Sequence, residues 1–178
     1  MSYLLIFIMS VWISSQGHLM YENITGISLL ERFHFLVIGY ILISSCFFAY
    51  KIRKLYKKIP THSFYQAIII ITALIECIGI LCPYSLNSHD LLSQVHVICC
   101  MSGCIAFLIL LFIYTRYLSY YYTDIYVKVH WFYDLGLQFL CILLIVFSRV
   151  NGYLEILYCG LICIYLFMLE KAFLKYHH

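Results

Sequence analysis

Glu76 stands out among the acidic residues because it lies well inside an apolar stretch, TALIECIGILCPY. An ionisable side chain in hydrocarbon is costly, and it usually faces protein, water or a ligand. Gly79 and Pro83 follow it at i+3 and i+7, so the three residues share one helical face. At 1.5 Å per residue, Glu76 lies about 10 Å below the helix end at Pro83. This position predicts a functional site.

His96 begins a comparable stripe on the next apolar stretch. A short loop joins the two stretches, so we expect their helices to be neighbours. His96 then either reaches down toward Glu76 or caps the loop beside His89 and Asp90. In a purely structural alternative, His96 bonds a loop carbonyl and Glu76 bonds across helices. The residues that follow His96 on its face are small, which allows two helices to approach closely; they are Cys99, Cys100, Gly103 and Cys104.

A third ionisable group lies in the segment LLERFHF, which contains Glu31, Arg32 and His34. Clusters of histidine and carboxylate are what a catalytic zinc or a proton-coupled site needs. No HExxH motif occurs, and no two of the outer histidines stand at i and i+4, so we expect no metal ion. We expect instead an outward-facing polar pocket. Its candidate residues are Glu76, His96, His89, Asp90, Arg32 and His34.

Histidines near both ends of the helices raise a haem alternative. It would use His34 and His96 on one side and His62 and His130 on the other, but these residues lie at helix boundaries rather than within the helices. Eight of the nine cysteines fall inside apolar stretches, where cysteine packs as a small apolar residue. No CxxC pair is followed by a second pair at zinc-finger spacing. We therefore expect no cofactor.

The composition decides the class of protein. The 178 residues are 65% hydrophobic and 11% charged, with a mean hydropathy of +0.95, so the charges are too few to solvate a globular surface. A spanning helix needs about 20 apolar residues. We predict an all-α, polytopic integral membrane protein in which residues 1–178 form a single six-helix transmembrane domain. The expected spans are Tyr3–Met20, Phe33–Tyr50, Phe64–Pro83, Leu92–Tyr114, Tyr133–Val150 and Leu154–Leu169.

The basic residues predict the orientation, because cytoplasmic loops retain positive charge. Only Arg32 and Arg149 fall on the outer side. Both chain ends are therefore expected in the cytoplasm, with the plasma membrane as the location. The tyrosine-rich stretch 117–126 is expected to be an interfacial connection on the cytoplasmic side. Nine of the 11 basic residues fall on that side: Lys51, Arg53, Lys54, Lys57, Lys58, Arg116, Lys128, Lys171 and Lys175.

The first apolar stretch has a second interpretation as a cleaved signal peptide, since its core is short and ISSQG offers small residues to a peptidase. Only Met1 and Ser2 precede the core, so the positive residues that begin a signal peptide are missing. We favour a retained first helix. Cleavage would leave five helices in the same orientation.

Several of these features resemble one superfamily. Six helices with both ends inside, a basic second connection, a third helix that ends in proline and a fourth that opens on QVHVICCMSG are similar to the DRAM autophagy modulators, the Sfk-type proteins and their bacterial relatives. The resemblance implies a multi-pass protein linked to membrane-lipid handling, without a defined reaction. The residues that carry it are Gly26–Ser28, Pro83, His96, Ser102 and Gly103.

We therefore expect a lipid-interacting or scaffold component of the membrane. Its expected partners are membrane lipids and another membrane protein, and we expect no binding to nucleic acid. The alternative function, of a different class, is an intramembrane enzyme or proton-linked carrier that uses Glu76 and His96.

Overall fold

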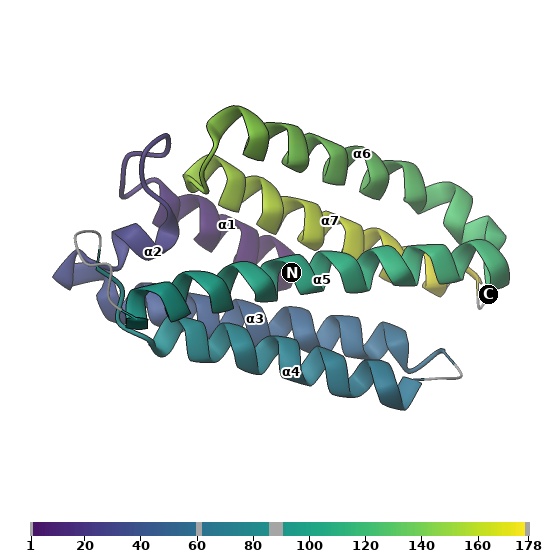
Figure 1. Ribbon diagram of the computed structural model, residues 1–178. Helices are drawn as coiled ribbons and strands as arrows, with labels where there is room; N and C mark the ends of the chain where they lie inside the picture. The colour runs from purple at the N-terminus through teal and green to yellow at the C-terminus, as the bar shows by residue number, and fades with distance from the viewer. Residues whose placement is uncertain (1, 60–61, 86–90, 177–178) are drawn as a thin grey trace. The chain divides into compact units, whose positions relative to one another are not determined.

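The computed structural model describes residues 2–59, 62–85 and 91–176 (Figure 1). Over these residues the chain is helical and contains no β-strand, which confirms the expected all-α class. The chain divides into two compact units, one made of residues 1–27 with 112–178 and the other of residues 28–111.

In the described part of the chain, five helices are long and apolar enough to cross a membrane. Large apolar side chains such as Phe35, Ile98 and Ile145 are exposed on them, as expected where lipid covers the surface. These helices are compatible with the expected class, a multi-pass membrane protein. They are α3 (His34–Tyr56), α4 (His62–Leu81), α5 (Leu91–Tyr121), α6 (Thr123–Phe147) and α7 (Gly152–Tyr176).

Several helices run further than the expected spans, at the ends expected in the cytoplasm. α3 continues to Tyr56 instead of Tyr50, α7 continues to Tyr176 instead of Leu169, and α6 begins at Thr123 instead of Tyr133. Hydropathy marks only the part of a helix that crosses hydrocarbon, whereas lysine and arginine are good helix formers. The expected spans therefore describe the most apolar part of each helix and miss where the helices end.

The connection expected over residues 117–126 is present but is only one residue long. α5 runs to Tyr121, and Tyr122 alone separates it from α6. Residues 105–134 contain no glycine or proline that would interrupt a helix. Tyrosine rings also pack well: the ring of Tyr122 meets the ring of Phe173 edge-on, with centroids 5.4 Å apart. The stretch is a helical hairpin with a one-residue turn.

α1 (Ser2–Ser14) is shorter than the expected span Tyr3–Met20. Its 13 residues extend for about 20 Å at the helical rise, which is less than the roughly 30 Å of hydrocarbon. Ser15 Oγ and Gln16 Nε2 both donate to the carbonyl oxygen of Trp12, at 2.7 and 3.2 Å. Such side-chain bonds compete with the helical ladder, so the helix stops. A sixth crossing stays a prediction.

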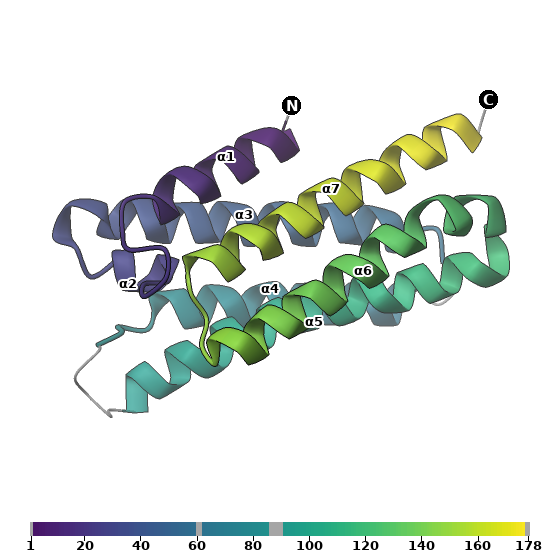
Figure 2. The same ribbon diagram turned by 90° about the horizontal axis from the view of Figure 1, so that it is seen from above.

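In the first unit, α7 packs against both α1 and α6 (Figures 1 and 2). The loop after α1 and the short helix α2 (Ile24–Ile27) close over the start of α7. The Gly152 N–H donates to the carbonyl oxygen of Glu22 at 2.8 Å, and Glu155 Oε2 accepts from the Ile24 N–H at 2.5 Å. These bonds satisfy backbone groups that the helix ends leave unpaired.

In the second unit, the 3-10 helix η1 (Glu31–Phe33) leads into α3, which runs beside α4 (Figure 1). The Tyr56 hydroxyl donates to the carbonyl oxygen of Leu110 at 2.5 Å and so ties the end of α3 to α5. α4 stops at Leu81, close before Pro83, because the residue that precedes a proline disfavours helical backbone. The expected end of this span is confirmed to within two residues.

Candidate functional site

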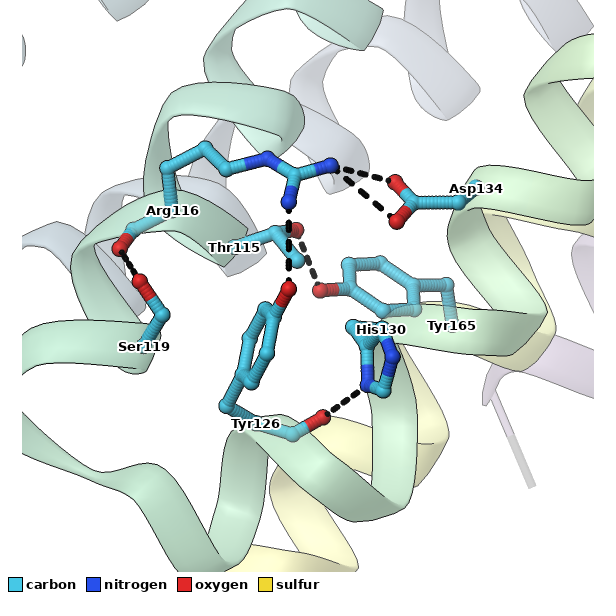
Figure 3. Close-up of polar contacts among 7 residues, drawn as sticks. All are labelled: Thr115, Arg116, Ser119, Tyr126, His130, Asp134 and Tyr165. Carbon is cyan, nitrogen blue, oxygen red and sulfur yellow. Dashed lines mark hydrogen bonds and ion pairs between the residues drawn. The ribbon is translucent and has the colours of Figure 1, made fainter.

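An ion pair joins α5 to α6 in the first unit (Figure 3). Arg116 Nη2 donates to Asp134 Oδ1 and Oδ2 at 2.9 and 3.0 Å, and Nη1 donates to the Tyr126 hydroxyl at 3.1 Å. The guanidinium carbon also lies 4.8 Å from the centre of the Phe112 ring. Charge-assisted hydrogen bonds are stronger than neutral ones, so this pair fixes the register of the α5–α6 hairpin.

Buried hydroxyl groups continue the same cluster toward α7. Thr115 Oγ1 and the Tyr165 hydroxyl lie 2.5 Å apart and share a hydrogen bond, and the Tyr165 ring lies 4.6 Å from the Tyr133 ring. His130 Nδ1 donates to the carbonyl oxygen of Tyr126 at 2.9 Å. The hydrogen bonds and the ion pair in Figure 3 thus join the drawn residues to one another. This is typical of a structural cluster rather than a reaction centre.

The sequence interpretation missed this cluster, because it assigned Arg116 to a connection and Asp134 to the next span. A signal was available. Residues of opposite charge follow each other across a stretch without glycine or proline, so they stand on consecutive helices of a hairpin. Two such residues at similar depth are expected to pair, since an unpaired charge near hydrocarbon is costly.

Glu76 lies in the second unit, where α4 meets α3 and α5. Its side chain is buried, at 7% exposure. Cys104 Sγ donates to Glu76 Oε1 at 3.4 Å, and Ser45 of α3 faces the same carboxyl. A Cβ atom at Gly103 would overlap the Glu76 side chain, so the glycine makes room for it. The prediction that α4 and α5 approach closely at small residues is confirmed.

His96 holds the turn that follows α4. Its Nδ1 donates to the carbonyl oxygen of Cys82 at 3.2 Å, and its ring stacks on Tyr84 with centroids 5.1 Å apart. Ser93 Oγ accepts from the Ser85 N–H at 3.1 Å in the same turn. The His96 side chain is buried, and its Nε2 has no hydrogen-bond partner among the described residues. The loop-carbonyl interpretation of His96 is confirmed.

The structure does not bring Glu76 and His96 together. Glu76 lies beside Gly103, and His96 precedes Gly103 by seven residues, which is about 10 Å along α5. No hydrogen bond or ion pair between the two side chains occurs in the described structure, so the alternative function that uses both residues has no contact to support it.

We expect the substitutions Glu76→Gln and His96→Ala to act independently. Their effects on the free energy of unfolding should add to within about 0.5 kcal/mol, because separated sites do not couple. Glu76→Gln combined with Cys104→Ala should depart from additivity, since those side chains touch. Thermal unfolding in detergent measures both cycles. Coupling between Glu76 and His96 as large as that between Glu76 and Cys104 would contradict the separation seen here.

The remaining residues of the expected outer pocket either make local contacts or fall outside the described structure. Arg32 is exposed and its guanidinium stacks 4.5 Å from the Phe33 ring. His34 is exposed and its Nδ1 donates to the carbonyl oxygen of Ser28 at 3.0 Å. His89 and Asp90 lie outside the described residues. A shared outer pocket therefore stays a prediction.

A different polar pocket opens where α3 ends and α4 begins in the second unit. Its volume is about 530 Å³, and it is lined by Arg53, Lys57, Ser63 and Gln66. Arg53 and Lys57 belong to the basic segment 51–58, KIRKLYKK, whose basic residues predicted the orientation in the sequence analysis. Ser63 and Gln66 were missed, because neutral polar residues at a helix start carry no distinctive pattern. The pocket brings two cations together with a hydroxyl and an amide.

The described residues contain no group of three or more histidine, cysteine, aspartate or glutamate side chains placed to hold a metal ion. Comparisons with known proteins add no assignment. The chain matches no known family model, no curated protein and no solved structure. The resemblance to the DRAM and Sfk-type proteins thus stays a prediction, and function has to be argued from the geometry alone.

Proposed function

We propose that the protein is a six-span protein of the plasma membrane that works as a lipid-interacting component. Both chain ends and the connection between α3 and α4 then face the cytoplasm. The observation that carries the proposal is the gathering of basic residues at the end of α3. They are Lys51, Arg53, Lys54, Lys57 and Lys58.

Anionic lipids in the cytoplasmic leaflet attract basic residues close to the surface, by about 1 kcal/mol for each residue. The opposite end of α3 carries Arg32 near its start. Within the second unit, the basic residues are therefore concentrated at the carboxyl-terminal end of α3. The positive-inside rule assigns the more basic end to the cytoplasm, where the anionic lipids are.

The contacts of α1 support a sixth crossing. The Tyr3 ring lies 6.3 Å from the ring of Phe167, and a Cβ atom at Gly160 would lie 3.1 Å from Phe7. α1 therefore runs along α7 to a level about 22 Å from the start of α7 at Gly152. Thinning of the bilayer or snorkelling side chains accommodate a short hydrophobic helix at modest cost.

Thiol labelling of intact cells tests the orientation. In a background whose nine native cysteines are replaced, we expect Ser85→Cys to react with a membrane-impermeant thiol reagent and Lys57→Cys to react only after the cells are opened. Both positions are exposed, so protection reports the membrane rather than burial. The reverse pattern would place the basic end outside and would contradict the proposal.

A further inference from the structure

The pocket between α3 and α4 is built from paired positions on two helices. Arg53 and Lys57 are spaced i and i+4 at the end of α3, and Ser63 and Gln66 are spaced i and i+3 at the start of α4. Residues at these spacings share a helix face. The four side chains therefore converge on one opening, with two cationic groups on one wall and two neutral polar groups on the other.

Two hydrogen bonds hold the arginine in place. Arg53 Nε donates to Gln66 Oε1 at 2.5 Å, and Gln66 Nε2 donates back to the carbonyl oxygen of Arg53 at 3.0 Å. Gln66 is itself buried, so one partner of this clamp is shielded from solvent. Within the described structure no partner binds the two terminal nitrogens of Arg53. Their N–H groups can therefore donate, side by side, to a bound group.

The charge of this end is positive and has no acidic counterpart in the pocket lining. Burial and the nearby Lys54 lower the pKa of Lys58, as expected where cations crowd together. The pocket also lies at the amino-terminal end of α4, where the helix dipole favours an anion. The positive charge of the pocket, the terminal nitrogens of Arg53 and the hydroxyl of Ser63 all suit a ligand with several negatively charged oxygens.

We propose that this pocket is a binding site for a phosphate monoester, supplied by the headgroup of an anionic lipid. A phosphate monoester carries about −1.5 to −2 charges and three terminal oxygens, which matches two cations and the available donors. A phosphodiester headgroup carries a single charge and two such oxygens, so it matches less well. The inference rests on the proposed lipid interaction only for the source of the phosphate.

Ligand-dependent thermal unfolding of the purified protein in neutral detergent tests the site. The ligands are phosphatidic acid as the lipid monoester, phosphatidylglycerol as the diester, and inorganic phosphate as the soluble source. We expect phosphatidic acid to bind about tenfold more tightly than phosphatidylglycerol, as one additional charge-assisted bond provides. Equal affinity for the two lipids would overturn the proposal.

Variants separate the pocket from general attraction. Arg53→Lys keeps the charge and loses the two terminal nitrogens, while Gln66→Leu loses the clamp without changing any charge. Each should remove most of the preference for the monoester. Lys54→Gln is the matched control, since Lys54 is an exposed neighbour outside the pocket lining, and it should weaken both lipids equally. If Gln66→Leu fails to fold, Arg53→Lys carries the test.

The outcomes distinguish this site from the proposed function. If Lys54→Gln and Arg53→Lys weaken phosphatidic acid equally, the lipid interaction stands as a surface attraction and the pocket is overturned. If inorganic phosphate binds as tightly as phosphatidic acid and responds to Arg53→Lys, the phosphate site stands and a soluble phosphate replaces the lipid as its ligand. If none of the three ligands stabilises the protein, both proposals fail.

Discussion

Replacing Gly79 with alanine is expected to destabilise the protein by about 1–3 kcal/mol, the usual cost of overpacking. A Cβ atom there would lie 2.8 Å from Cys100 Sγ, 2.9 Å from Cys99 Cβ and 3.0 Å from the backbone nitrogen of Cys100. A side chain can rotate away, but a backbone atom inside a helix moves only with the helix. α4 and α5 would therefore have to separate at this point.

Gly39→Ala is the matched control for Gly79→Ala. Gly39 lies inside α3, and a Cβ atom at this position would meet nothing within 4 Å. Alanine is a better helix former than glycine by about 1 kcal/mol, so this change should be neutral or slightly stabilising. Thermal unfolding in detergent compares the two variants. Equal effects would show that α4 and α5 do not meet closely at Gly79.

The second large effect is expected at the Arg116–Asp134 ion pair. Hydrogen bonds to charged groups contribute about 1.5–3 kcal/mol when shielded, and exposed pairs contribute about 1 kcal/mol or less. The side chains are 42% and 27% exposed. We therefore expect a coupling energy of about 1–2 kcal/mol in a double-mutant cycle of Arg116→Ala and Asp134→Ala, an intermediate value that follows from this partial exposure.

Asp124 supplies the control for that cycle. It is an exposed acid in the first turn of the same helix, α6, and no ion pair with Arg116 is seen for it. The combination of Arg116→Ala with Asp124→Ala should be additive to within about 0.5 kcal/mol. Equal coupling for the two acids would mean that Arg116 senses only the general charge of α6, and the register of the hairpin would then need another explanation.

The two polar sites differ in how readily the sequence reveals them. Glu76 and His96 are conspicuous, because each interrupts an apolar stretch, yet the structure places them about two helical turns apart. Arg53 and Gln66 are ordinary in sequence, yet they clamp each other across α3 and α4. Which residues share a site depends on the register between helices, and a single sequence contains no direct record of register.

The sequence by itself determined the class of the protein. A chain with 65% hydrophobic and 11% charged residues has too few charges to solvate a globular surface. Lipid hydrocarbon offers no hydrogen bonds, so backbone groups inside it must pair with one another in regular structure such as helices. The ends of the helices were less well predicted, because the tyrosine-rich stretch 117–126 looks interfacial by composition and contains nothing that stops a helix. Hydropathy reports the solvent around a segment, whereas helix ends depend on local hydrogen bonds.

Only the tertiary structure decided the contacts that could do chemistry. It separated Glu76 from His96, because Glu76 packs beside Gly103, seven residues further along α5 than His96. It paired Arg116 with Asp134 across a one-residue turn, and it closed Arg53 and Gln66 over a pocket. The physical reason is the same in each case: side-chain sites arise where helices touch, and the depth and rotation of each helix are set by packing rather than by hydropathy.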